Sequence, residues 1–405
     1  MWVSEIKSQA IPQGHARRTM SLSTLINTFG NGLFMTVEVI YFTLIIGLSP
    51  AKVALALSIA GGVALSFSVP AGHISDRFGP RDIASLAMVL EGALMFVLLS
   101  VHTYIPFLLV NIGMGILGNI SQTMRMATIA NLGEGEERVA IRAYQRAVTN
   151  FGISLGTVFA GIALAINTPI AYQLLLAGDA VTFILAGYVF RKMPFMQPTV
   201  ERGEPISFQA LRDKRFLGAT ALNAINSLHF VLQSVAIPLW VVRETSAPRW
   251  WVSVIMMVNT IAVMLFQVAA SKGSGPIFAG AKLYRRASLA IAIACILYST
   301  SHGVSAITAS ALLVLASAVH VYGELIGSAG SWSIGFGLAD EKHQGQYQGV
   351  WSLSWGLGGT LGPAFVTLMA ITLGQEGWFI MAGIFLINGI LMHKLVTRSW
   401  ISTPA

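Results

Sequence analysis

The chain has 405 residues, of which 55% are hydrophobic and only 10% are charged, and its formal net charge is +8 at pH 7. Soluble domains carry roughly a quarter charged residues, so a soluble protein of this size could not cover its surface with so few. The composition excludes an ordinary soluble domain and indicates an integral membrane protein.

Apolar stretches of near twenty residues recur along the whole chain. A hydrocarbon core about 30 Å thick needs about 20 residues of helix. By this length we predict an all-α integral membrane fold with twelve spans in two sets of six. The first set is 21–47, 51–71, 83–103, 105–130, 143–165 and 170–190. The second set is 216–241, 250–270, 287–303, 305–335, 346–372 and 376–396.

One long polar interruption, 191–215, separates the two sets and contains three prolines. Such a segment is typical of a linker between two bundles. We therefore expect an N-terminal six-helix bundle over 1–190, a cytoplasmic linker over 191–215 and a C-terminal six-helix bundle over 216–405.

The two halves show weak similarity to each other at one offset. The run at 84–87 recurs at 287–290, and Tyr144-Gln145 recurs as Tyr347-Gln348, both 203 positions on. Parallel repeats of six spans, related by an axis along the membrane normal, are a recurrent transporter plan with the binding site between the halves. We expect the two bundles to be pseudo-symmetric.

The positive charge is distributed asymmetrically. If both termini are cytoplasmic, all but three of the 25 Lys and Arg residues fall in or near cytoplasmic segments, the exceptions being Lys52, Arg243 and Arg249. This is the positive-inside pattern, and it explains the basic balance without nucleic acid. We expect a multi-pass protein of the cell (inner) membrane, with 1–20 retained as a cytoplasmic end and no cleavable signal.

A polar loop follows the second predicted span and reads Gly72-His73-Ile74-Ser75-Asp76-Arg77-Phe78-Gly79-Pro80-Arg81. It resembles the G-x-x-x-D-R-x-G-x-R signature of the major facilitator superfamily, with matches at Gly72, Asp76, Arg77, Gly79 and Arg81. Gly72 would let helices approach closely, and Gly79 would permit a tight turn. Asp76 could take either an arginine partner or a helix N-terminus.

The resemblance implies that this loop latches the two halves in the outward-facing state. The alternative is a charged loop that only obeys the positive-inside rule. In the equivalent loop of the second half, Gly275 persists but Ala279 replaces the acid.

Span five contains the run 152–161, which is similar to the antiporter motif of the same family, and 358–363 in span eleven repeats its first half. Small residues four apart also serve helix packing alone, so both interpretations stay open. The full chain resembles bacterial multidrug-resistance-like members, which are drug:proton antiporters. It departs from them because span four has no arginine at its middle; Asn111 lies nearest, and Arg125 is toward the cytoplasmic end.

Four acids fall within the predicted spans: Glu38, Glu91, Asp179 and Glu324. A charge at the bilayer centre costs about 2.5–3.5 kcal/mol or more, so such residues face a cavity, pair or carry a proton. The resemblance implies that spans one, four, seven and ten line a central cavity. Glu38 and Glu324, with His320 one turn from Glu324, are therefore the proton-coupling candidates. Glu91 and Asp179 lie in outer spans, where we expect structural roles.

Polar side chains in the inner spans are the substrate or cavity candidates. Each has the alternative of a hydrogen bond between helices or of simple packing. They are Asn27, Asn31, Asn111, Gln122, Asn223, Asn226, His229, Gln233, Trp351 and Trp355, of which the two tryptophans could form a stacking wall. No convergent ligand set is visible in the sequence, so we expect no metal.

The leading hypothesis is a secondary transporter that exports small amphipathic compounds in exchange for protons by rocking of the two bundles. The alternatives are a transporter of one defined metabolite and a non-transporting membrane receptor. No phosphate-binding loop and no nucleophile–base pair is present, so we expect no enzyme and no cofactor beyond the proton gradient. The expected partners are a small-molecule substrate and the lipid bilayer, without nucleic acid, and we expect a monomer.

Overall fold

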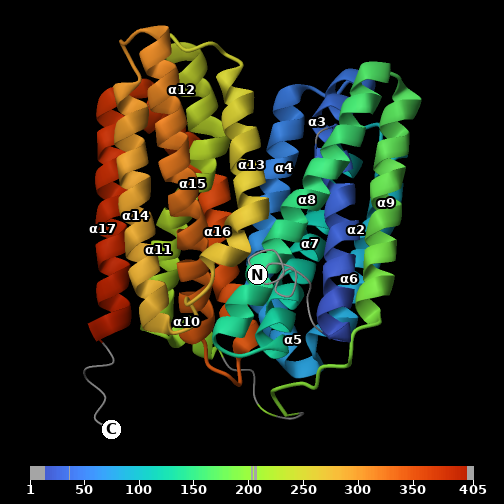
Figure 1. The fold of residues 1–405 in the computed structure, drawn as a ribbon. Helices are drawn as coiled ribbons and strands as arrows, with labels where there is room; N and C mark the ends of the chain where they lie inside the picture. Colours follow the sequence, from blue (N-terminus) through green and yellow to red (C-terminus); the bar gives the residue numbers. More distant parts are fainter. Residues whose placement is uncertain (1–13, 36, 202–203, 205–207, 399–405) are drawn as a thin grey trace, which may run out of the picture. The chain divides into compact units, whose positions relative to one another are not determined.

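The computed structural model describes the chain except for residues 1–13, 36, 202–203, 205–207 and 399–405. The described part is helical, with one isolated bridge between Thr245 and His302 (Figure 1). Its first half contains α2 (His15–Met35), α3 (Glu38–Ile40), η1 (Tyr41–Ile45), α4 (Pro50–Ser66), α5 (Ser68–Phe78), α6 (Pro80–Leu98), α7 (Tyr104–Leu132), α8 (Glu136–Ile166) and α9 (Pro169–Arg191).

The second half contains α10 (Gln209–Arg212), α11 (Lys214–Val231), η2 (Leu232–Ala236), α12 (Ile237–Glu244), α13 (Trp251–Ala270), α14 (Ile277–Thr300), α15 (Ala306–Gly337), α16 (Gln344–Thr367), η3 (Leu368–Thr372) and α17 (Gln375–Arg398). Eleven of the predicted spans coincide, within the described residues, with a helix or with helices continued through a short π-helix, and the span 51–71 coincides with α4 and the first part of α5. The η segments are π-helical turns that continue the helix before them.

Nine described helices are long and apolar enough to cross a membrane, or ten if α4 and α5, which bend by 43°, count as one span. The remaining two predicted spans are occupied by α6 and α14. Each of these helices carries three charged side chains, which lower its apolar character. Helix formation at all twelve positions therefore agrees with the prediction. Of the six charged side chains on α6 and α14, Glu91 alone is buried.

Backbone contacts divide the chain into two compact units. The first unit comprises 1–134, 144–209 and 340–349, and the second comprises 135–143, 210–339 and 350–405. Thus α8 and α16 each begin in one unit and continue in the other. The predicted bundle boundaries at 1–190 and 216–405 stay predictions, and part of the predicted linker lies outside the described residues.

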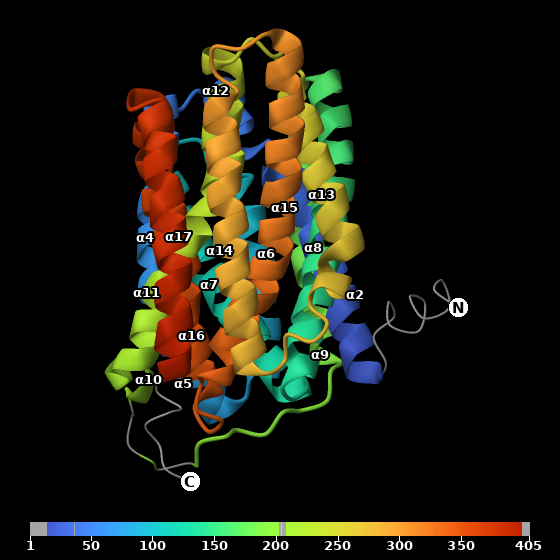
Figure 2. The ribbon, with the colours of Figure 1, turned by 60° about the vertical axis from the view of Figure 1, so that its left-hand side comes forward.

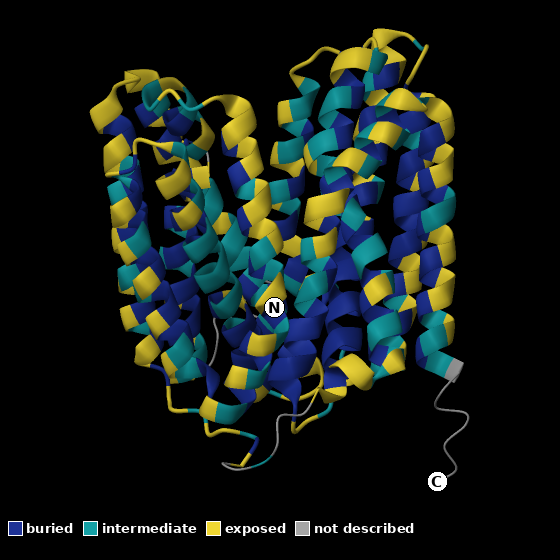
Figure 3. Ribbon diagram, turned by 180° about the vertical axis from the view of Figure 1, so that it is seen from behind, coloured by how far each residue is buried: buried dark blue, intermediate teal, exposed yellow. Residues whose placement is uncertain are grey.

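The core of the second unit is built around α14, which lies between α15 and α17 (Figures 1 and 2). Trp240 and Trp378 are its largest fully buried side chains, with ring centroids 5.6 Å apart. The indole nitrogen of Trp240 donates to the Tyr298 carbonyl over 2.8 Å, which satisfies its polar atom inside the core. Buried and exposed positions alternate along the individual helices (Figure 3).

Close helix approach in the first unit depends on glycine. Gly156 of α8 faces α2, where an added Cβ would lie 2.9 Å from the Cα of Gly32 and would overlap the Phe29 carbonyl. Gly152, one turn earlier, would place a Cβ 3.1 Å from the Leu25 carbonyl oxygen. Part of the antiporter-like run 152–161 thus serves packing in this structure, as small residues four apart do in other membrane helices.

Replacing Gly156 by alanine should destabilise the protein by about 1–3 kcal/mol, because the new methyl group overlaps backbone atoms that cannot rotate away. Gly161→Ala, in the same helix, is the matched control, since a Cβ there meets nothing within 4 Å. Both changes give the same gain in helix propensity. Thermal unfolding in detergent should show a lower midpoint for Gly156→Ala only. Equal midpoints for the two variants would contradict the close approach of α2 and α8.

Candidate functional site

The carboxylate of Asp76 accepts hydrogen bonds from the first backbone N–H groups of α16. The Gly345 nitrogen lies 2.6 Å from Oδ1, and the Gln346 nitrogen lies 2.9 Å from Oδ2. Asp76 is only 4% exposed. Both partners belong to the segment 340–349 of the first unit. The sequence offered an arginine or a helix N-terminus as the partner of Asp76, and in the structure the partner is the N-terminus of α16. The unsatisfied N–H groups and the positive dipole of a helix N-terminus favour an anion.

Two glycines of the same motif make this contact sterically possible. A Cβ on Gly72 would collide with the carbonyl oxygen of Gly345, so the two backbones touch where Asp76 binds. Gly79 has a φ of +80°, between the end of α5 and the start of α6. An L-residue would be strained there, and its Cβ would also overlap the Met196 carbonyl.

The two arginines of the motif bind the segment that follows α9. Arg77 donates to the Glu204 carbonyl, and Arg81 donates to the Met193 carbonyl over 3.1 Å. The Arg81 guanidinium also lies 5.1 Å from the ring centre of Phe195. Residues of the motif thus contact Met193, Met196 and Glu204 after α9, and also the start of α16.

In the equivalent region of the second unit, the acid lies on the helix start and the backbone N–H lies in the segment between α13 and α14. Glu136, the first residue of α8, accepts a hydrogen bond from the Gly273 nitrogen over 2.5 Å. Gly275 lies against the backbone of Glu136, where an added Cβ would be 2.5 Å from its Cα. The acid missing at Ala279 is therefore matched by an acid on the helix that the loop contacts.

Arg125 organises the polar interior of the first unit. Its guanidinium, carried by α7, donates to the Asn27 side chain over 3.0 Å and to the Thr24 hydroxyl over 2.6 Å, both on α2. Thr24 in turn donates to Gln145 of α8 over 2.6 Å. The predicted cavity residue Asn27 is thus held by an arginine.

Three carboxyl groups extend from Arg125 through the same unit. Glu91 of α6 interacts electrostatically with Arg125 and with Asp179 of α9, and Asp179 interacts with Glu38. The Thr182 hydroxyl lies 3.3 Å from Oδ1 of Asp179. Glu91 and Asp179, expected to be structural from their outer spans, therefore lie in one set with the coupling candidate Glu38. The roles of all three stay predictions.

Glu38 differs from the other two acids. Glu91 is 8% and Asp179 0% exposed, whereas Glu38 is half-buried. Its buried Oε1 has no hydrogen-bond partner within the described part of the chain. It is the first residue of α3, the short helix that continues into the π-helical turn η1. Such π-turns within α-helices occur frequently at functional sites.

Three further cavity candidates of the first unit differ from one another in burial and in hydrogen bonding. Asn31 is half-buried on α2 and Gln122 is exposed on α7. Asn111 is buried and donates to the Phe107 carbonyl of its own helix over 2.9 Å. Among the α7 residues Asn111, Gln122 and Arg125, the structure describes a hydrogen bond to another helix for Arg125 alone.

The amides of α11 lie in the interior of the second unit. Asn223 donates to Ser354 of α16 over 2.7 Å and accepts from Ser331 of α15 over 2.8 Å. Asn226 is buried as well, and Gln233 is half-buried within η2. Asn223 thus connects three helices, as expected for a hydrogen bond between spans.

His229, His320 and Glu324 converge in the second unit, although the sequence shows no convergent ligand set. The Nδ1 atom of His229 on α11 lies 3.5 Å from the Nε2 atom of His320 on α15. One donor atom from each of the three side chains lies within 4.8 Å of the other two. Glu324 also accepts a hydrogen bond from Asn259 of α13 over 2.7 Å.

The two candidate tryptophans of α16 have different partners. Trp351 is buried, with its ring centre 5.6 Å from that of Phe216 and its indole against Gly335. Trp355 is half-buried and lies 4.9 Å from the ring centre of Phe230. Packing thus accounts for both rings, and the stacking wall stays a prediction.

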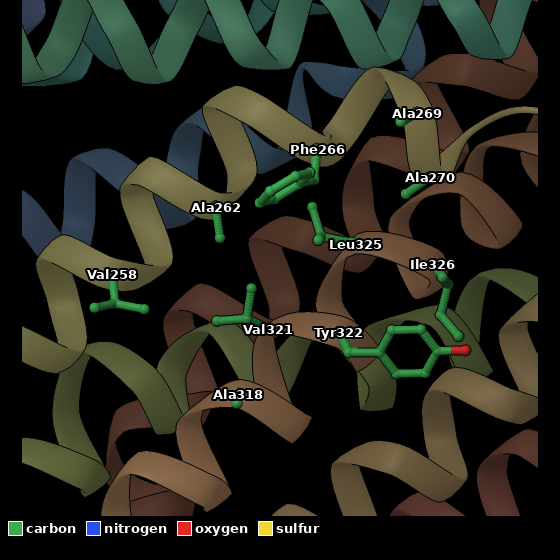
Figure 4. A pocket seen from close by; sticks show the side chains of 10 residues that line it. All are labelled: Val258, Ala262, Phe266, Ala269, Ala270, Ala318, Val321, Tyr322, Leu325 and Ile326. Carbon is green, nitrogen blue, oxygen red and sulfur yellow. The ribbon is translucent and has the colours of Figure 1, made fainter. Parts of the chain in front are cut away.

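An apolar groove of about 500 Å³ runs between α13 and α15 (Figure 4). Val321 and Leu325 of α15 extend toward Ala262 and Phe266 of α13, and the Tyr322 hydroxyl is the polar side-chain group of the lining. The lining residues are Val258, Ala262, Phe266, Ala269, Ala270, Ala318, Val321, Tyr322, Leu325 and Ile326. This groove suits hydrocarbon and offers no titratable carboxyl or imidazole group.

Comparison with solved structures shows the same fold. A human organic anion transporter, MFSD10 (TETRAN), matches with a TM-score of 0.71 at 13% identity, over 93% of this chain and 98% of that one. An outward-facing bacterial homologue of the iron transporter ferroportin matches with a TM-score of 0.73 at 13% identity, over 96% of this chain and 100% of that one. FucP, a Major Facilitator Superfamily transporter in the outward conformation, matches with a TM-score of 0.71 at 11% identity, over 94% of this chain and 98% of that one.

The sequence comparisons give the family. No curated protein sequence matches the chain significantly. The sequence profile of the Major Facilitator Superfamily matches residues 20–339, which is more than three quarters of the chain. The predicted all-α membrane fold and the absence of an enzyme are thereby confirmed. The chain belongs to the Major Facilitator Superfamily and is a secondary transporter of the multi-pass membrane type.

Proposed function

We propose that this transporter exports small amphipathic compounds in exchange for protons, and that the acid set of the first unit carries the proton. The observation behind this proposal is the excess of acids in the set that begins at Arg125. Glu91 interacts with the Arg125 guanidinium, Asp179 interacts with Glu91, and Glu38 interacts with Asp179, which gives three carboxyl groups to one guanidinium. Uncompensated carboxylates are costly in a membrane interior, and a bound proton removes one such charge.

Glu38 is the member of this set best placed to exchange a proton with water. It is half-buried, whereas Glu91 and Asp179 are buried, and its Oε1 has no partner among the described residues. Through Asp179 a change in its charge reaches Glu91 and then Arg125. Arg125 joins α7 to α2 by hydrogen bonds, so this series of interacting side chains connects the protonation of Glu38 to the packing of two helices.

An amphipathic organic substrate is supported by the likeness of 152–161 and 358–363 to the antiporter motif of the family. Transport of one defined metabolite is the second candidate, favoured by the absence of an arginine at the middle of span four. The proposed setting is the cell (inner) membrane with both termini cytoplasmic, as the distribution of basic residues favours. The proposed active form is a monomer.

The contact of Asp76 with α16 is proposed to act as the latch of the transport cycle. α16 begins in the first unit and continues in the second, so a movement of α16 relative to α5 has to break two charge-assisted hydrogen bonds. Bonds of this kind are worth about 1.5–3 kcal/mol each. The latch would therefore bias the conformational equilibrium without being needed for folding.

Asp76→Asn should slow transport roughly tenfold or more while the protein still inserts, since an amide cannot accept from both N–H groups and its NH₂ group meets another donor. Asp82→Asn, which changes an exposed acid six positions on, is the matched control. Initial rates of substrate flux in vesicles, corrected for the amount of protein, measure the effect. A rate for Asp76→Asn equal to that of Asp82→Asn would remove the latch role.

Arg125→Met should destabilise the protein, because it leaves the nearby carboxyl groups without their opposite charge. Adding Glu91→Gln to the Arg125→Met variant should recover part of the lost stability, since it removes one of those charges. In a double-mutant cycle on thermal stability we expect a coupling energy of about 0.5–3 kcal/mol between the two positions. Additive effects would mean that Glu91 and Arg125 do not act together.

Glu38→Gln should abolish proton-driven transport while substrate binding survives, because glutamine keeps the shape of the side chain but cannot titrate. Glu376→Gln, at an exposed acid of α17, is the control; Glu91 is unsuitable because it interacts with Arg125. The measurement is substrate-dependent proton movement in proteoliposomes with an imposed pH gradient, run over a panel of amphipathic compounds and polar metabolites.

Accumulation against the gradient by Glu38→Gln at the wild-type level would contradict the coupling role of Glu38. Response to several amphipathic compounds supports the first substrate class, and response to a single metabolite supports the second. Both outcomes leave the assignment of the fold unchanged.

A further inference from the structure

We propose that His229, His320 and Glu324 form a binding site for one divalent transition-metal ion of the Zn²⁺ class. The three side chains are at most 3% exposed, and they come from α11 and α15 of the second unit. The proposal is independent of the proton coupling assigned to the first unit, because it concerns different residues on different helices.

The spacing of the two imidazoles fits a shared ion better than a direct hydrogen bond. The His229 Nδ1 and His320 Nε2 atoms face each other at 3.5 Å, beyond the usual 2.9–3.0 Å of an N–H hydrogen bond. Zn–N bonds of 2.0–2.1 Å in a tetrahedral site set two ring nitrogens about 3.3–3.4 Å apart. The ring nitrogens therefore stand near the separation that a metal ion requires.

The third ligand comes from the same helix as His320. His320 and Glu324 are four residues apart on α15, so both project from one face, a spacing that also presents two zinc ligands in metal-binding helices. A Glu324 oxygen lies within 4.8 Å of both imidazole nitrogens. Coordination of one ion by all three side chains requires this oxygen to approach the two nitrogens to about 3.3–3.4 Å, as tetrahedral bonds of about 2 Å imply.

The surroundings support this ligand set in two ways. Asn259 donates to Oε2 of Glu324 over 2.7 Å, and a hydrogen bond of this kind orients a ligating carboxylate. A divalent ion would also compensate the carboxylate charge, which is costly in a membrane interior. Two histidines and one carboxylate suit Zn²⁺ or Fe²⁺ with further positions open, whereas Mg²⁺ and Ca²⁺ prefer oxygen ligands alone.

Binding of Co²⁺ to the purified full-length protein, prepared without a polyhistidine tag, tests the site. We expect one Co²⁺ per chain with visible d–d bands of low-coordinate geometry, displaced by Zn²⁺ and unaffected by Mg²⁺. His320→Gln and Glu324→Gln should each weaken binding at least about tenfold, and Asn259→Ala about 10–100-fold. His302→Gln, at an exposed histidine of the same unit, should bind like wild type.

The absence of stoichiometric binding, or equal binding by Glu324→Gln and wild type, would overturn the proposal. X-ray absorption of the Zn²⁺-loaded wild-type protein gives a test that needs no variant to fold. Two imidazole ligands and one carboxylate are expected around the ion; a spectrum with oxygen ligands only, or with one imidazole, would place the metal elsewhere. A loss of proton coupling without a loss of Zn²⁺ binding would bear on Glu38 and not on this site.

Discussion

The bilayer core contains no water, so every polar group placed there must find its partner within the protein. This constraint decides where the charged side chains of this transporter lie. Asp179 receives the Thr182 hydroxyl, Glu324 receives the Asn259 amide, and Arg125 bonds to two side chains of α2. The contacts of Glu324 and Arg125 join different helices, whereas the Thr182 hydroxyl bonds to Asp179 within α9. Glu324 and Arg125 are therefore also part of what holds the helices in place.

Glycine provides the space that these contacts need. A Cβ on Gly118 of α7 would lie 3.0 Å from Oε1 of Glu91, and a Cβ on Gly30 of α2 would overlap Asp179 and Thr182. A carboxyl group can therefore be buried between helices because the opposite helix has no side chain at that level. Small residues here serve two purposes, close approach of backbones and room for a buried acid, and a motif search by itself does not separate them.

The spans were predictable because they depend on local composition, and the fold class followed from their number. For Asp76 the sequence predicted a partner of one of two kinds, an arginine or a helix N-terminus. It could not identify α16, because this helix begins almost 270 residues further along the chain. The set of Glu38, Glu91 and Asp179 was not visible, because the position of a span in the bundle says nothing about which face its acids occupy. His229 and His320, 91 residues apart, lacked any local pattern that would link them. Asn31 and Glu38, predicted in one span, lie on the separate helices α2 and α3.

The two halves show how a repeated scaffold can hold different chemistry. The repeat at an offset of 203 residues keeps the small residues of 84–87 and 287–290, but the polar interior of the two units differs. In the first unit a set of acids extends from an arginine, and in the second an amide and two histidines lie near Glu324. The contacts differ in the same way: Asp76, near the end of α5, binds the start of α16, whereas Glu136, at the start of α8, binds the Gly273 nitrogen after the end of α13. Because helix packing depends on the small residues, the charged positions were free to change sides. A proton-bearing site in one unit and an ion-coordinating site in the other are therefore compatible with one ancestral fold.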